Sequence, residues 1–127
     1  MAKDRQCSGF VRVKGTYSGK GGGAPTPSFT SYGKPFYYEA ANWTAGTAFY
    51  WEVFMRRVVG TAYSRLLDIT SGSSVADSQV STTNLDFQRI RSSAVTLTDA
   101  HEYMGQLGKV SGDSGEGAGG EIIGVPP

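Results

Sequence analysis

The chain has 127 residues, enough for one domain that buries roughly two-thirds of the surface its unfolded form would expose. Twelve basic residues stand against eleven acidic ones, and the two signs are interspersed, which argues against nucleic acid as the principal partner because phosphate binding needs a basic stripe. The single cysteine, Cys7, excludes an internal disulfide.

The first ten residues carry Lys3 and Arg5 but no apolar stretch of signal-peptide length, and no later segment approaches the length of a membrane span. With Met1 as the native start, we expect synthesis in the cytoplasm and no membrane partner. Eighteen glycines, many serines and threonines, and short aromatic or β-branched runs predict an all-β chain. No window of helical length shows a 3.6-residue apolar period, so we expect almost no helix.

In chain order, the first predicted strand covers residues 9–17 and is followed by a glycine- and proline-rich loop at 18–27. Further strands are predicted at residues 28–32, 35–41, 47–58, 61–69, 74–81, 86–91, 94–97, 101–110 and 120–125. Residues 111–120 are predicted to form a second loose loop. This spacing of strands is typical of a sandwich or barrel. We divide the single domain into residues 1–34, with an N-terminal arm, first strand and loop, and residues 35–127, the β-sandwich.

The phrase Gly-Thr-Ala, followed by an aromatic residue, occurs loosely at Gly46 and again at Gly60, and we expect the two copies to open two adjacent strands of the sandwich. In the strand at 47–58 the odd positions are uniformly apolar, whereas the even positions mix charge with aromatic rings. The odd face is therefore predicted to lie in the core and the even face to be partly covered or to face a ligand. The predicted core residues are Phe36, Tyr38, Phe49, Trp51, Val53 and Met55.

Aromatic and arginine side chains are the types that stack on sugar rings or anchor protein interfaces. Five of them are our candidates for contact with a partner or a glycan: Tyr50, Arg56, Tyr63, Arg65 and Trp43. The sequence leaves open whether this set binds a sugar or another protein subunit.

Motifs that could carry catalysis do not withstand inspection. The GDSG at residues 112–115 is shared with the nucleophile loop of chymotrypsin-like proteases, but the single histidine, His101, lies just before it rather than far upstream. The segment GTYSGKGG is one residue short for a phosphate loop, and Pro25 and Pro27 argue against the helix that such a loop needs. We therefore expect no catalytic and no cofactor-binding residues.

A metal site is not expected either. Asp99, His101 and Glu102 lie close together in sequence, but adjacent residues of a strand point to opposite faces, and no second cluster completes a ligand set.

Residues 36–108 resemble a jelly-roll-type β-sandwich module found in tailed-phage virion proteins and in bacterial surface proteins. The phrases that carry the resemblance are FYYEAANW, GTAYSRLLDITSGSSVADSQVSTT, RIRSSAVTL and EYMGQLG. The resemblance covers a little over half of the chain and lies in residues that determine the fold. It implies an antiparallel jelly-roll-like β-sandwich with an extended N-terminal arm, and it brings no catalytic residues.

From this resemblance we expect a non-enzymatic structural protein of a phage particle, made in the host cytoplasm and located in the virion. It would be a capsid decoration or accessory protein that binds the major capsid protein, or another virion protein, and stabilises the shell. Association into a homo-oligomer such as a trimer would cover exposed strand edges. The alternative is a carbohydrate-binding or cell-surface adhesion module on the extracellular surface, with Tyr50, Tyr63 or Trp43 as its stacking platform for a surface glycan.

Overall fold

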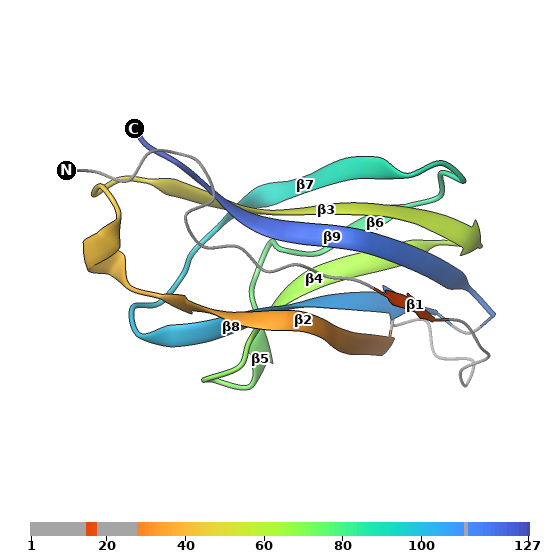
Figure 1. Ribbon diagram of the computed structural model, residues 1–127, viewed down its shortest axis with the longest axis horizontal. Helices are drawn as coiled ribbons and strands as arrows, with labels where there is room; N and C mark the ends of the chain where they lie inside the picture. Colours follow the sequence, from red (N-terminus) through yellow and green to blue (C-terminus); the bar gives the residue numbers. More distant parts are fainter. Residues whose placement is uncertain (1–14, 18–27, 111) are drawn as a thin grey trace.

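A computed structural model describes residues 15–17, 28–110 and 112–127 (Figure 1). Cys7, the predicted arm, most of the first predicted strand and the predicted loop at 18–27 lie outside these residues. The described chain is nearly all β, with a single turn of 3-10 helix at Ala40–Asn42. Its strands are β1 (Gly15–Tyr17), β2 (Ser28–Tyr38), β3 (Ala48–Val59), β4 (Ala62–Asp68), β5 (Ser73–Ser74), β6 (Val80–Thr82), β7 (Gln88–Val95), β8 (His101–Lys109) and β9 (Ser114–Val125).

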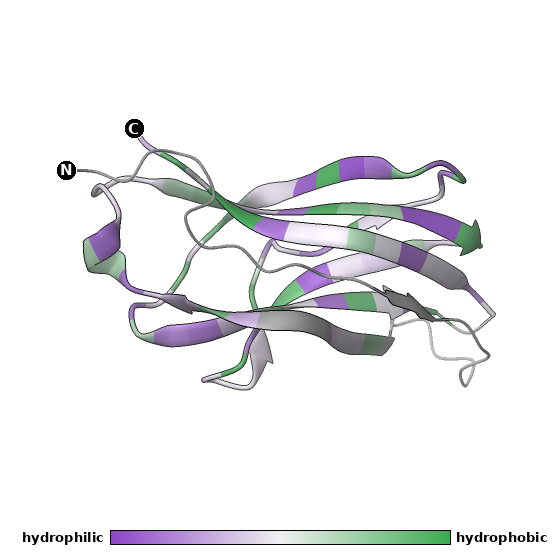
Figure 2. Ribbon diagram, in the orientation of Figure 1, coloured by the Kyte–Doolittle hydropathy of each residue, from purple (hydrophilic) through white to green (hydrophobic). Residues whose placement is uncertain are grey.

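The strands form two antiparallel sheets that pack as two layers (Figure 1). Sheet 1 has the order β1-β9-β3-β7, and sheet 2 has the order β2-β8-β4-β5, with β6 also paired to β4. Apolar and polar residues come in short alternating stretches along the strands, as expected when one face of each sheet is buried (Figure 2). The prediction of an all-β sandwich is confirmed.

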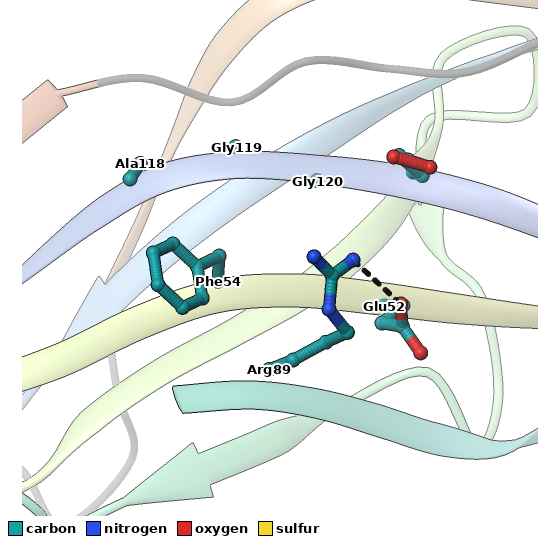
Figure 3. A pocket seen from close by; sticks show the side chains of 7 residues that line it. Glu52, Phe54, Arg89, Ala118, Gly119 and Gly120 are labelled. Atoms are coloured by element: carbon teal, nitrogen blue, oxygen red, sulfur yellow. Dashed lines mark hydrogen bonds and ion pairs between the residues drawn. The ribbon is translucent and has the colours of Figure 1, made fainter. Parts of the chain in front are cut away.

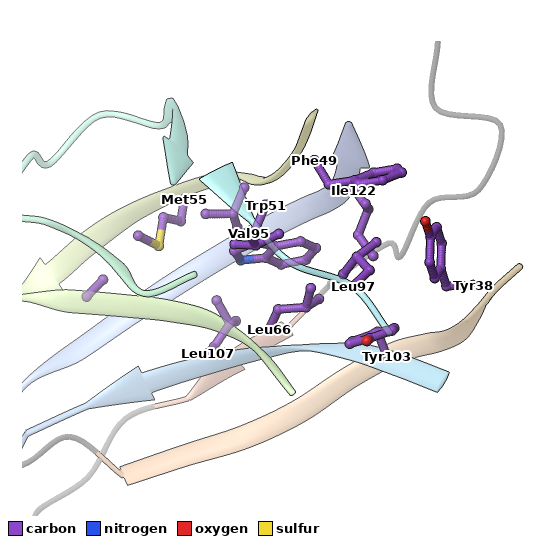
Figure 4. Packing of buried hydrophobic residues seen from close by; sticks show 12 residues of the cluster. Tyr38, Phe49, Trp51, Met55, Leu66, Val95, Leu97, Tyr103, Leu107 and Ile122 are labelled. Atoms are coloured by element: carbon purple, nitrogen blue, oxygen red, sulfur yellow. The ribbon is translucent and has the colours of Figure 1, made fainter. Parts of the chain in front are cut away.

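The core lies between the two sheets and is centred on Trp51, which is completely buried (Figure 4). From sheet 1, the odd positions of β3 from Phe49 to Met55 point inward, and from sheet 2, Leu66 and Leu107 point toward them. The Trp51 indole Nε1 donates a hydrogen bond of 2.9 Å to the Oγ of Ser64 across the layers. Of the six predicted core residues, five are buried and Phe36 is partly buried against the same cluster, so this prediction is confirmed.

The glycine-rich segment at 111–120 differs from its prediction as a loose loop, because Ser114 to Gly120 belong to the long strand β9. Its inward glycines lie where large side chains fill the space that a Cβ would take. A Cβ on Gly117 would come within 2.8 Å of the Leu107 side chain, and one on Gly120 within 2.4 Å of the Trp51 ring. Glycine is normally weak in strands, but here it lets a bulky neighbour pack directly against the backbone.

Strand β2 runs through the predicted boundary at residue 34, so the sandwich begins before residue 35. Two strands had been expected here, at 28–32 and 35–41, and the structure has one, with a shift in its pairing to β8 between Tyr32 and Phe36. Such an irregularity accommodates Pro35, which has no N–H to contribute to the ladder.

Two other stretches differ from their predictions. The strand expected at 74–81 is two short strands, β5 and β6, separated by a turn in which Asp77 has a φ of +68°. The strands expected at 86–91 and 94–97 form one strand, β7.

The repeated Gly-Thr-Ala phrase opens β3 and β4 as expected, with φ of +87° at Gly46 and +72° at Gly60. The expectation that the two strands are adjacent is wrong, because β3 and β4 are consecutive in the chain but belong to different sheets. Gly60 lies at the corner where the chain crosses from one layer to the other. A Cβ on Gly60 would also collide with the carboxylate of Asp113, which leaves no room for another residue.

Candidate functional site

The outer face of sheet 1 carries the even-numbered residues of β3, which point away from the core. Two strands flank β3: β7 on one side and β9 on the other. The residues of β3 on this face are Tyr50, Glu52, Phe54 and Arg56. These four side chains share one face because successive side chains of a strand point to opposite sides of the sheet.

Glu52 is held by two arginines from the neighbouring strand β7. Its Oε1 accepts from Arg89 at 3.1 Å and its Oε2 accepts from Arg91 at 2.9 Å, while Glu52 is only 8% exposed. The Arg91 guanidinium carbon also lies 5.3 Å from the centre of the Tyr50 ring. A carboxylate this buried needs such pairing, because an unpaired buried charge is costly.

Two phenyl rings stack on the same face as the ion pairs of Glu52. Phe54 and Phe87 lie with centroids 5.1 Å apart and ring planes at 25°, and both are more than a third exposed. The Arg56 guanidinium sits 5.3 Å from the Phe87 ring centre and donates to Glu116 through Nε at 2.6 Å. The ion pair between Arg56 and Glu116 therefore lies against one side of the stacked rings.

A shallow pocket of about 150 Å³ opens between these groups (Figure 3). The Arg89 guanidinium lies between the Phe54 ring and Glu52 in this view. The pocket is lined by Glu52, Phe54, Arg89, Ala118, Gly119, Gly120 and Glu121. Glu121 is the cross-strand neighbour of Glu52, and its carboxylate makes no hydrogen bond or ion pair with any side chain that the structure describes. We call this the sheet 1 pocket.

The outer face of sheet 2 carries the other two predicted contacts on strands, Tyr63 and Arg65. The Arg65 Nε donates to the Gln106 Oε1 at 2.7 Å, and its guanidinium carbon stacks 3.9 Å from the centre of the Phe29 ring. Gln106 in turn donates through Nε2 to the Ser31 Oγ at 3.2 Å. Burial lowers the pKa of the Arg65 guanidinium.

The five predicted contact residues therefore do not come together. Tyr50 and Arg56 lie on the outer face of sheet 1, whereas Tyr63 and Arg65 lie on the outer face of sheet 2, with the whole sandwich between them. Trp43 is half buried, packs edge-to-face on Phe49 at 5.0 Å, and lies against the backbone of Gly124. A stacking platform that combines Tyr50 with Tyr63 is not available in this geometry.

Sequence reasoning missed Phe54, Arg89 and Glu121 as site residues. The mixed even face of β3 was a signal for Phe54, since it predicted charge and rings on a surface that could face a ligand. The other two come from β7 and β9, and only the pairing of these strands with β3 brings them to the same place.

The GDSG segment and His101, which the sequence analysis considered for catalysis and metal binding, make contacts within the fold. Ser114 of the GDSG segment is buried at the start of β9. His101 donates from Nδ1 to the Asp68 carboxylate at 2.8 Å, which joins the end of β4 to the start of β8. Among the described residues, no group of three or more His, Cys, Asp or Glu side chains could hold a metal ion.

The part of the chain that the structure describes contains no helix long and apolar enough to cross a membrane. Comparison of the sequence with protein-family models and with curated proteins gives no match.

Proposed function

We propose that this chain is a non-enzymatic structural protein of a phage particle, a capsid decoration protein that binds the shell and stabilises it. The outer face of sheet 2 is the observation that carries the proposal. Its middle strands, β4 and β8, present half-buried apolar and aromatic side chains with Arg65 and Gln106 among them, and the exposed Glu102 lies toward one end. The residues that form this proposed docking surface are Phe29, Tyr63, Arg65, Leu67 and Met104.

This composition fits a protein interface. The buried centres of interfaces are enriched in aromatic residues, methionine and arginine and are depleted of other charges. The outer face of sheet 1, by contrast, carries Glu52, Arg56, Arg89, Arg91, Glu116 and Glu121. Sheet 2 therefore offers the face that loses less hydration free energy when it is covered by another protein.

The strand pairing gives further support. Strand β1 pairs with β9, β2 with β8, β3 with β7, and β4 with β5 and β6, so the first of the described strands pairs with the last and the pairing continues inward. A nested pairing of this kind is what we expect of a jelly roll, an architecture that occurs in viral capsid and lectin domains. We propose the jelly roll as the finer description of the sandwich.

In this proposal the physical mechanism is burial of surface area. A subunit that bridges neighbouring shell proteins adds interface only in the assembled state, and it shifts the equilibrium toward that state by mass action. Among the described strands, β7 ends sheet 1 and β2 ends one side of sheet 2, which leaves backbone edges for contacts within a homo-oligomer such as a trimer.

Co-sedimentation with purified tailed-phage shells tests the proposal. The wild-type chain is expected to pellet with the shells and to raise the temperature at which they open. Tyr63→Ala is expected to weaken this binding by roughly tenfold or more, the effect of losing an interface anchor. Tyr50→Ala, on the opposite face, is the matched control and should bind like the wild type.

Two outcomes would contradict the proposal. A chain that stays in the supernatant with every shell tested would remove the decoration function. Shell binding that is lost in Tyr50→Ala but kept in Tyr63→Ala would place the contact on sheet 1 and not on sheet 2.

The alternative function, a carbohydrate-binding or cell-surface adhesion module, is favoured by a separate observation, the sheet 1 pocket.

A further inference from the structure

We propose that the sheet 1 pocket binds one neutral pyranose ring of a glycan. This inference rests on the pocket alone and not on the decoration function, so either can fail without the other. A pocket of about 150 Å³ is well below the range of roughly 300 to 1,000 Å³ that holds a drug-sized ligand, so its occupant is a single small ring.

The pocket has one apolar wall that is fixed in place before any ligand arrives. Phe54 is 40% exposed, and its ring stacks on that of Phe87, with the two ring centroids 5.1 Å apart. Phe87 is itself covered by the Arg56 guanidinium, which Glu116 holds. A ring held in this way offers a flat apolar surface to the C–H face of a sugar, with little side-chain entropy left to lose on binding.

The floor of the pocket is unusually bare. It is formed by Ala118, Gly119 and Gly120 of β9, so a ligand meets a methyl group and backbone rather than long side chains. A flat ring can therefore approach the sheet closely while one of its faces lies against Phe54.

The polar groups offer both an acceptor and a donor. Glu121 is the free acceptor, since it has no partner among the described residues, while the neighbouring Glu52 is already occupied by Arg89 and Arg91. The Arg89 side chain is 64% exposed and uses one terminal nitrogen on Glu52, which leaves other N–H groups to donate. A sugar hydroxyl can donate to a carboxylate and accept from a guanidinium, so a diol matches this pair.

The local charge favours a neutral ligand over an ion. Among the described residues around the pocket, Arg56, Arg89 and Arg91 balance Glu52, Glu116 and Glu121. A basic side chain placed beside Glu121 would also lie near the Arg89 guanidinium, which lines the same pocket, and an anion placed beside Arg89 would meet the Glu121 carboxylate. A neutral polyhydroxylated ring avoids both repulsions and uses both groups.

Ligand-observed NMR by saturation transfer tests this site with the full chain. The probes are the methyl glycosides of glucose, galactose, mannose and N-acetylglucosamine, with arginine amide as a cationic probe. We expect saturation transfer to at least one glycoside. Glu121→Gln is expected to weaken its binding by about tenfold, the size of one lost charge-assisted hydrogen bond.

Two further variants separate the site from the fold. Ala118→Leu fills the pocket from an exposed position and is expected to abolish binding, while its circular dichroism stays that of the wild type. Tyr37→Ala removes an aromatic ring, half exposed, from the outer face of sheet 2 and is expected to leave glycoside binding unchanged.

The proposal is overturned if the wild type binds none of the glycosides, if binding persists in Ala118→Leu, or if Tyr37→Ala abolishes it. Tighter binding of arginine amide than of every glycoside would also overturn it and would assign the pocket to a basic side chain of a partner protein. Glu121→Gln keeps the shape of the pocket, so glycoside binding that is unchanged in this variant also overturns the proposal, even where Ala118→Leu does not fold.

Discussion

Ser64 shows how a single hydroxyl serves both sheets. It is completely buried, accepts a hydrogen bond from the Trp51 indole at 2.9 Å, and donates to the Gln106 carbonyl at 2.7 Å. The indole N–H has its partner in the opposite layer, so the largest core side chain is fixed in orientation as well as buried. The small size of Ser64 is what leaves room for the ring between the sheets.

Replacing this hydroxyl should therefore destabilise the protein. Ser64→Ala leaves the Trp51 N–H buried without a partner, and we expect a loss of about 1 to 3 kcal/mol in the free energy of unfolding. Urea denaturation followed by tryptophan fluorescence measures the loss. Ser81→Ala is the control, because Ser81 is exposed, and it should change stability by less than about 0.5 kcal/mol. Equal effects in the two variants would show that the hydrogen bond contributes nothing.

Among the elements, β3 and β9 lie side by side in sheet 1, but only for β3 can the inward and outward faces be predicted from the sequence. The faces of β3 are apparent from alternation alone, because side chains in a strand change sides at every residue. In β9 the inward positions Gly117 and Gly120 have no side chain, so they give no apolar pattern. Their packing partners, Leu107 and Trp51, come from other strands and become evident only once the layers are assembled.

The glycines of β9 should be as sensitive as a core residue. Gly120→Ala places a Cβ about 2.4 Å from the fully buried Trp51 ring, and we expect a loss of roughly 1 to 3 kcal/mol from overpacking. The control is Gly119→Ala, because this neighbour lies on the outer side of the strand opposite Phe54. Thermal unfolding compares the two variants. If Gly119→Ala lowers the midpoint as much as Gly120→Ala does, strand propensity and not the Trp51 contact explains the glycine.

For the whole molecule, the two-layer arrangement decides which surface residues can act together. The sequence predicted the sandwich and the inward residues of β3, and it predicted that the even face would be mixed. It could not predict that β3 and β4, separated by the corner at Gly60, enter different sheets. That single crossing places Tyr50 and Tyr63 on opposite outer faces, and the pairing of β7 and β9 with β3 brings Arg89 and Glu121 together.

Within sheet 2, two neighbouring strands are joined at one end by a buried carboxylate. Desolvation by burial raises the pKa of Asp68, but hydrogen bonds from the His101 ring and the Ser71 amide outweigh it, and the net pKa is lowered. A carboxyl group whose pKa is lower in the folded protein than in the unfolded chain stabilises the fold above its unfolded pKa. That contribution is lost as the pH falls through the folded value.

The stability of the whole chain should therefore fall in acid through this group. Below about pH 4, near the usual pKa of an aspartate, we expect the free energy of unfolding of the wild type to decline with decreasing pH. Asp68→Asn is expected to be less stable than the wild type near neutral pH and to show a shallower decline in acid, because it has no carboxylate to protonate. Urea unfolding across this range measures both slopes, and Asp77→Asn, at an exposed turn, should retain the slope of the wild type. Parallel acid slopes for the wild type and Asp68→Asn would mean that the link between β4 and β8 does not depend on the charge of Asp68.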